Sequence, residues 1–299
     1  MVVMSGGFES EVIASEQWGL WDNLEIYGGP IYSRPAVSEF VGEIEEVFEL
    51  VEEREELRDE LLEENFEAGL YNDYDFDYNT EKPESPVGSF GFQVGLSNRL
   101  TEGYQAKVNY SMMNIGFSAR GENEIWIDFD TEDEDDFNEA ELDFTSELDI
   151  DVNMRLHGAE AEFSIPLLMR GERDVVNILS HFTLNIGAGY YWGSGDYEVS
   201  FYEYERFTGE DADGEEFDEE EEDEDDYSAE IELEGTGGLN IGGGFNYEID
   251  NNILFFADIN YRYLEMDMDF SNSNQEDLNG VINEDFSGLE FKAGFGYSF

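Results

Sequence analysis

The clearest pattern in the chain is an alternation of apolar and polar residues with a period of two. From Leu289 to Phe299 every odd position is apolar and every even position is glycine, polar or charged. The side chains of a β-strand point alternately to its two faces, so this pattern predicts strands with one apolar and one polar face. It marks residues 86–98, 103–121, 178–206, 228–248, 252–270 and 286–299.

Two further segments alternate less regularly. In residues 22–33, Leu24, Ile26 and Tyr32 share a phase that Ile31 breaks. In residues 142–168 the apolar positions change phase near Gly158, and we expect a β-bulge or a kink there. With these two segments the sequence predicts eight strands.

Long and short connections alternate between these strands along the chain. The connections after the second, fourth and sixth strands are short, and those after the first, third, fifth and seventh are long. Outer-membrane barrels have short periplasmic turns and long extracellular loops. We therefore predict an all-β fold, an eight-stranded antiparallel transmembrane β-barrel formed by residues 22–299 as one domain, with residues 1–21 as an N-terminal segment. The expected acidic extracellular loops lie at about 122–141, 207–227 and 271–285.

One segment has a helical pattern instead. Between residues 36 and 68 apolar residues recur at spacings of three and four among glutamates, which predicts one amphipathic helix inserted in the first long loop. Pro35 and Gly69 are suitable residues at its two ends.

Composition narrows the class of protein. The 299 residues include 76 Asp and Glu against 13 Lys and Arg, a net charge of −63, which excludes nucleic acid as a partner. An aromatic content of 15% indicates a folded chain, and the lack of Cys excludes disulfides and thiolate chemistry. No apolar run approaches the 18 residues of a membrane-spanning helix. Residues 1–8 do not have the pattern of a signal peptide, so we expect an exported protein with this sequence to be in its mature form.

The last strand carries a resemblance to a known family. It has alternating aromatic residues, Phe295 and Tyr297, and ends with Phe299. This pattern resembles the last strand of small bacterial outer-membrane barrels of the OmpA-transmembrane-domain and OmpX-like kind. The resemblance covers about residues 86–299 as architecture. It implies a bacterial outer-membrane location, the lipid bilayer as surroundings, and recognition of these three residues by the barrel-assembly machinery. The helix and the extreme acidity depart from the family's pattern.

The polar faces of the predicted strands supply the candidate interior residues. We expect these side chains to face the lumen, where charges of both signs would pair and fill a narrow barrel. They are Lys107, His181, Asn185, Asp258, Arg262, Glu290 and Lys292.

The acidic runs have two interpretations. Of the 18 residues from 209 to 226, 14 are acidic, which favours adaptation to brine, where about 1 M salt shortens the Debye length to roughly 3 Å. The alternative is cation capture by clustered carboxylates, with Asp211, Asp213 and Glu215 as candidate ligands that lack the spacing of a calcium loop.

No catalytic constellation and no cofactor motif is found, so we expect a protein that is not an enzyme. The function favoured by the sequence is a structural or surface-interaction barrel of the outer membrane, adapted to high salt. A narrow, porin-like channel that favours cations is the second hypothesis. A soluble β-barrel that binds a small apolar ligand is the third, and it requires apolar residues inside and polar residues outside.

Overall fold

The computed structural model describes residues 24–68, 70, 72–82, 88–100, 104–130, 137–167, 181–211, 215–250, 252–271 and 280–299. These residues form one antiparallel sheet and one long helix, α1 (Ser38–Glu67). The strands are β1 (Leu24–Pro35), β2 (Asp73–Glu81), β3 (Ser89–Arg99), β4 (Gln105–Asp130), β5 (Phe137–Pro166), β6 (Phe182–Asp211), β7 (Glu216–Asp250), β8 (Ile253–Tyr263), β9 (Glu265–Ser271), β10 (Gly280–Asp285) and β11 (Gly288–Ser298). The all-β class and the helix are as predicted, but the described sheet has eleven strands instead of eight.

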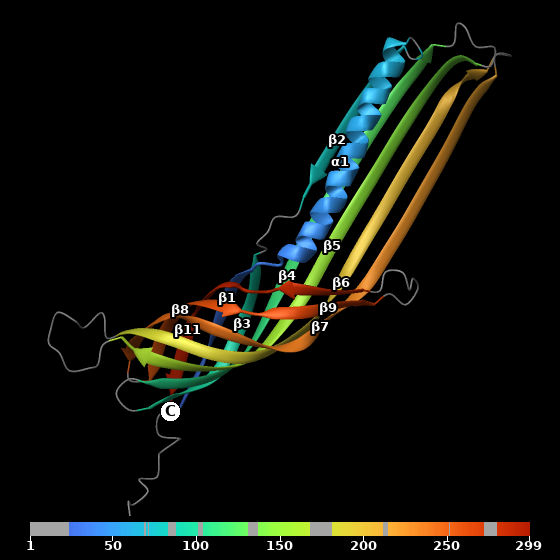
Figure 1. The fold of residues 1–299 in the computed structure, drawn as a ribbon. Helices are drawn as coiled ribbons and strands as arrows, with labels where there is room; N and C mark the ends of the chain where they lie inside the picture. The colour runs from blue at the N-terminus through green and yellow to red at the C-terminus, as the bar shows by residue number, and fades with distance from the viewer. Residues whose placement is uncertain are drawn as a thin grey trace, which may run out of the picture.

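Eight of these strands pair in a closed circuit (Figure 1). β1 pairs with β3 and with β11, β11 pairs with β8, and β8 pairs with β7. From β7 the pairing continues through β6, β5 and β4 back to β3. A closed circuit has no unpaired edge, so within the ring each of the eight strands has a paired strand on both sides.

The other three strands extend this ring. β2 pairs with the distal part of β4, β9 pairs with residues 230–233 of β7, and β10 pairs with β9. The predicted strand 252–270 is thus two strands, β8 and β9, separated at Leu264. The prediction missed β2, although Tyr74, Phe76 and Tyr78 alternate there with Asp and Asn.

Beyond the ring, β4 to β7 continue as a long sheet that β2 joins at the edge of β4, and α1 lies on this sheet (Figure 1). We call this part of the molecule the extension. Much of the acidic sequence predicted as loops is strand instead: β4 runs to Asp130, β6 runs to Asp211 and β7 starts at Glu216. Likewise, residues 280–285 form β10. Strand preference depends on packing against cross-strand neighbours, and aromatic contacts such as Phe207 with Phe217, 5.1 Å between ring centroids, favour strands within the acidic runs.

The first half of α1 packs into the end of the ring from which the extension continues, which we call the mouth. Phe40, Val41, Ile44 and Phe48 are buried in one apolar cluster with side chains of β4, β5, β7 and β9. The carboxylate of Glu284 in β10 accepts hydrogen bonds from the first-turn N–H groups, at 2.6 Å from Phe40 N and 3.3 Å from Glu39 N. A distant strand therefore supplies the cap of this helix.

The phase change near Gly158 is not a bulge. β5 is paired without a register shift there, and Gly158 lies opposite both Ser111 and Tyr191. The apolar face changes because Met154 and Leu156 point into the apolar cluster at the mouth, whereas Ala161 and Phe163 lie on the outer surface of the ring. One regular strand thus passes through two different environments.

Candidate functional site

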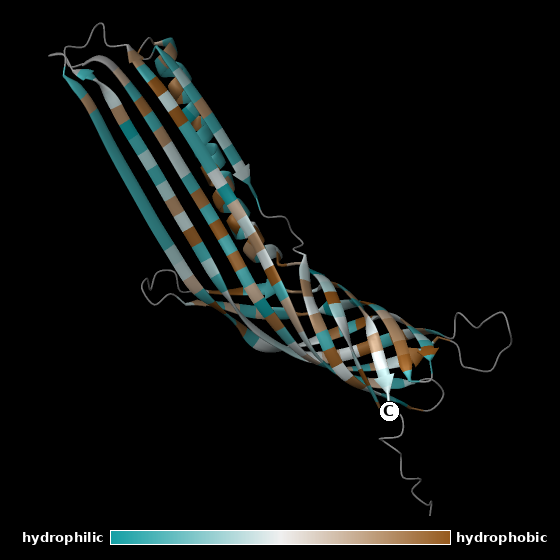
Figure 2. Ribbon diagram, turned by 180° about the vertical axis from the view of Figure 1, so that it is seen from behind, coloured by the Kyte–Doolittle hydropathy of each residue, from teal (hydrophilic) through white to brown (hydrophobic). Residues whose placement is uncertain are grey.

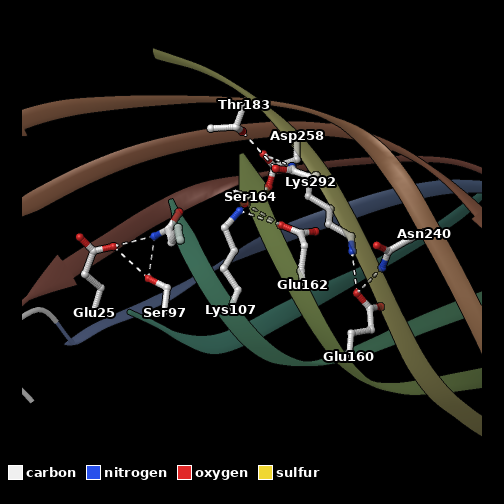
Figure 3. Close-up of polar contacts among 12 residues, drawn as sticks. Glu25, Ser97, Lys107, Glu160, Glu162, Ser164, Thr183, Asn240, Asp258 and Lys292 are labelled. Atoms are coloured by element: carbon white, nitrogen blue, oxygen red, sulfur yellow. Dashed lines mark hydrogen bonds and ion pairs between the residues drawn. The ribbon is translucent and has the colours of Figure 1, made fainter. Parts of the chain in front are cut away.

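The interior of the ring is filled with polar and charged side chains. Every second residue of a ring strand points inward, and buried polar groups occupy many of these positions. Six of the predicted lumen residues are among them: Lys107, Asn185, Asp258, Arg262, Glu290 and Lys292. The polar side chains of the interior form three groups of contacts, several members of which are drawn in Figure 3.

The first group surrounds the buried carboxylate of Glu25. Ser97 Oγ donates to Glu25 Oε2 at 2.9 Å, and Gln105 Nε2 donates to the same oxygen at 3.1 Å. Arg99 Nε lies 2.6 Å from the other carboxylate oxygen, Oε1. This group lies at the end of the ring where β3 turns into β4, and both oxygens of its carboxylate have partners.

The second group joins four strands. Lys107 Nζ of β4 lies 2.9 Å from Glu162 Oε1 of β5 and 3.5 Å from Asp258 Oδ2 of β8. Asn185 Nδ2 of β6 donates to Asp258 Oδ1 at 3.2 Å. One buried lysine thus links carboxylates from two other strands.

The third group contains two cations. Lys292 Nζ lies 3.0 Å from Glu160 Oε2 and 3.2 Å from Glu290 Oε2. Arg262 Nη1 lies 2.6 Å from Glu290 Oε1, and its guanidinium lies 5.5 Å from the centroid of the Tyr191 ring. The arginine therefore combines an ion pair with a cation–π contact at the boundary of the apolar cluster.

The second and third groups together hold three cations and four carboxylates. Removing such charges from water costs several kcal/mol per ion, roughly, and pairing with good hydrogen-bond geometry offsets that cost. The arrangement therefore fills the interior and links strands across it. Among the described residues no group of three or more His, Asp or Glu is arranged to hold a metal ion.

Next to the third group the interior becomes apolar and meets α1. The cluster that occupies it includes Met113, Ile115, Leu156, Tyr191, Leu233, Leu264, Met266 and Phe286 together with the first half of α1. The side chains inside the ring are thus polar over one part of its length and apolar over the rest.

Sequence reasoning missed three interior acids, Glu25, Glu160 and Glu162. Glu160 and Glu162 follow Gly158 and alternate with Ala159, Ala161 and Phe163, whose side chains lie on the outside of the ring. A signal for them was present, because a strand whose apolar residues move to the outer face must carry its polar residues inward.

His181 is not in the interior groups. Its ring centroid lies 5.9 Å from that of Phe245 and 5.7 Å from that of Tyr247, an exposed residue. The prediction that it fills the lumen is therefore not met. The period-two pattern was extended one residue beyond the start of β6 at Phe182, where strand alternation no longer fixes the direction of a side chain.

The remaining predicted residues belong to the proposed assembly signal and to the acidic run. Phe295, Tyr297 and Phe299 have exposed side chains, and Phe299 N donates to Leu24 O at 3.4 Å. Asp213 lies outside the described residues, as does the side chain of Asp211, and Glu215 is exposed.

The outer surface of the ring carries a belt of exposed apolar side chains. Figure 2 shows hydrophobic and hydrophilic positions alternating along its strands. Large exposed members of this belt are Phe90, Phe92, Val94, Val108, Phe163, Phe182, Ile186, Leu239, Ile241, Ile259, Phe291 and Phe295. Phe245 is half-buried. The ring thus has the polarity of a soluble protein reversed, with apolar residues outside and ion pairs inside.

No known protein family and no curated protein sequence matches this chain. Among solved structures it is similar to the Escherichia coli Outer Membrane Protein W in solution, with 10% identity, a TM-score of 0.31, and coverage of 94% of this chain and 100% of that chain. It is also similar to a TodX deltaS2S3 mutant described as a monoaromatic hydrocarbon channel, with 8% identity, a TM-score of 0.18, and coverage of 92% and 67%. TM-scores and identities this low carry no inference about function.

No helix within the described ranges has both the length and the apolar composition needed to cross a membrane.

Proposed function

We propose that this chain is a β-barrel of the bacterial outer membrane, that its closed interior serves stability, and that its extension faces the external medium as an interaction surface. The observation that carries the proposal is the reversed polarity of the ring. The hydrocarbon core of a membrane accepts the exposed belt, and the ring satisfies its backbone groups internally.

Aromatic side chains at the edge of the belt support this placement. The rings of Tyr110 and Trp192 lie 5.9 Å and 5.8 Å from that of His157, and Tyr110 Oη lies 2.6 Å from His157 Nδ1. Aromatic groups with a polar end are typical of the boundary between lipid and water.

The alternative functions receive less support. A soluble barrel with an apolar ligand inside requires the opposite polarity on the two faces of the ring. A cation channel requires a passage, whereas Lys107, Arg262 and Lys292 are buried in ion pairs across the interior. The regular alternation of β11 up to Phe299 supports recognition by the barrel-assembly machinery.

Adaptation to high salt is part of the proposal. In the extension Glu203 lies directly opposite Asp223, and Glu205 lies directly opposite Glu221. Like charges in such positions destabilise a sheet, and concentrated salt screens their repulsion.

Cell fractionation and bilayer conductance together test this proposal. We expect the protein to sediment with the outer membrane and to resist extraction by salt. Purified protein reconstituted in lipid vesicles should float with them in a density gradient, which shows insertion. When the same vesicles are fused to planar bilayers, we expect no discrete conductance steps. Recovery in the soluble fraction would contradict the membrane location, and cation-selective steps would contradict the closed interior.

A further inference from the structure

Helix α1 covers only part of the extension. Phe40 contacts Tyr197 at 6.0 Å between ring centroids, Arg58 lies 5.4 Å from the centroid of Phe144 in β5, and Leu62 packs with Ile125 of β4. Along most of its length α1 therefore lies over β4 and β5, and Figure 1 shows β6 and β7 running beside it uncovered.

A second apolar stripe on α1 is exposed. Val47, Leu50, Leu57 and Leu61 have exposed fractions of 45%, 62%, 61% and 58%. Glu52 marks the opposite side of the helix, because it binds Thr80 and Lys82 at the β2 side. At 3.6 residues per turn Leu50, Leu57 and Leu61 lie about 140–180° around the helix from Glu52. The residues Ile44, Phe48 and Leu62, which pack on the sheet, lie about 40–80° from Glu52 in the opposite sense. Leu50 and Leu57 therefore point mostly away from the sheet. Val47 and Leu61, about 80° and 120° from the sheet-facing side of the helix, lie on the side of β6 and β7.

The face of β6 and β7 on this side is partly apolar. Since Tyr197 contacts α1, the alternate residues Val199, Phe201, Glu203 and Glu205 share its face. Val199 and Phe201 are half-buried and continue the apolar cluster beyond Tyr197.

The dimensions of this surface fit one further helix. Two strands spaced about 4.8 Å apart present a width of about 10 Å, which is close to the diameter of a helix. Residues 47–61 of α1 rise about 21 Å, and residues 199–205 of β6 span about 20 Å. A helix of roughly four turns would lie beside α1 and cover Val47 and Leu61 together with the apolar residues of β6.

The acidic residues on this face of β6 and β7 indicate the charge of a partner that could bind there. Glu203, Glu205, Glu221 and Asp223 form two opposed like-charged pairs, and within the described residues no basic side chain forms an ion pair with them. On the other face of the same strands, Arg206 pairs with Asp218 at 2.9 Å.

These observations indicate a basic occupant. A second copy of this chain would bring another glutamate-rich α1 against the same carboxylates, which like-charge repulsion opposes.

We propose that the exposed stripe of α1 and the adjoining face of β6 and β7, together called the α1–β6 face, bind a cationic amphipathic helix of a partner protein. Its apolar side would contact Val47, Leu61 and Phe201, and its basic side chains would pair with Glu203, Glu205, Glu221 and Asp223. The inference rests on the proposed function, in which the extension is exposed to the external medium.

Peptide binding to the full chain in zwitterionic nanodiscs tests the inference. The probe is a labelled 18-residue Leu–Lys peptide with amphipathic helical spacing, and a scrambled peptide of equal composition and empty nanodiscs are its controls. We expect saturable binding of the amphipathic peptide and at least tenfold weaker binding of the scrambled one.

Matched charge variants locate the binding surface. E221Q/D223N removes two charges from the α1–β6 face, and E222Q/E224Q removes two charges from the opposite face of the same strand. The first variant and Val47→Glu should each raise Kd at least tenfold, whereas the second should leave Kd within about twofold. Equal effects of the two charge variants, or equal binding of the scrambled peptide, would overturn the inference.

Two further measurements, of self-association and of membrane insertion, distinguish failure of this inference from failure of the proposed function. Self-association of the protein without peptide, abolished by Val47→Glu, would overturn the inference in favour of a second copy. Flotation of the same samples reports insertion, so a protein that binds the peptide but does not insert would contradict the proposed function alone.

Discussion

At the scale of single residues, the interior ion pairs distinguish a filled barrel from a water-filled one. Lys292 contacts the carboxylates of both Glu160 and Glu290, and all three side chains are almost completely buried. In a dry interior the loss of one partner leaves the other charge without compensation, whereas water in an open lumen would hydrate it.

The substitution Lys292→Met tests this distinction. We expect it to lower the free energy of unfolding by about 3–5 kcal/mol, because Glu160 loses its cationic partner inside the ring. Adding Glu160→Gln should recover part of the loss, since the unpaired charge is then removed as well. Urea unfolding in detergent micelles measures both variants. A loss below about 1 kcal/mol for Lys292→Met would indicate a hydrated interior.

Glu284 gives the helix cap a defined pH dependence. Burial raises the pKa of Glu284 above its ordinary value of 4.5, although N–H groups of Phe40, Glu39 and Asp285 oppose the shift. The folded chain thus holds this proton more tightly than the unfolded chain, so the contribution to stability is full below pH 4.5 and is lost as the pH rises through the raised pKa. Between pH 4 and 7, roughly, wild type should lose stability relative to Glu284→Gln. Parallel melting curves across that range would contradict the assignment.

At the scale of elements, α1 depends on the ring for its stability more than the ring depends on α1. The pairings that close the ring involve strands only, whereas α1 is held by side-chain packing at the mouth and by Glu284. We therefore expect α1 to detach without opening the ring.

Phe48→Ala should detach α1. The side chain is fully buried, and its truncation should cost about 3–5 kcal/mol of local stability. Leu50→Ala, two residues away and 62% exposed, is the matched control and should change stability by less than about 0.5 kcal/mol. Hydrogen exchange should speed up in α1 but not in β3 or β11. Equal loss of protection in the ring strands would mean that helix and ring form one cooperative unit.

The elements also show which parts of the fold could be predicted from the sequence alone. The alternation in 289–299 and the spacing in 36–68 correctly predicted β11 and α1, because each pattern reflects one constant environment along the element. The prediction failed where the environment changes, as at Gly158, and where strands carry acidic runs, as in β6 and β7. The cap from Glu284 could not be predicted, since it joins residues 244 positions apart.

At the scale of the whole molecule, the dominant quantity is the net charge of −63. Its repulsion acts mainly in the extension, where most of the acidic runs lie in exposed strands. The interior ion pairs are shielded from solvent and respond little to salt.

Salt should therefore stabilise the extension more than the ring. The Debye length falls from about 10 Å at 0.1 M salt to about 3 Å at 1 M, so NaCl should raise the melting temperature of the extension, with KCl acting equally. Circular dichroism melting in detergent measures the transition. If micromolar calcium gave the whole effect and monovalent salt gave none, the acidic runs would be a specific metal site.

A membrane-spanning barrel requires the outer face of the ring to contact lipid. Since the chain lacks Cys, a single spin label can be placed at Ile186→Cys in the belt and at Ser200→Cys on the exposed face of the extension. In lipid vesicles, we predict that the label at position 186 collides more often with molecular oxygen, which dissolves in lipid, than with a water-soluble nickel chelate. The label at position 200 should show the reverse. Preference for the nickel chelate at both positions would place the belt in water and contradict the membrane-spanning barrel.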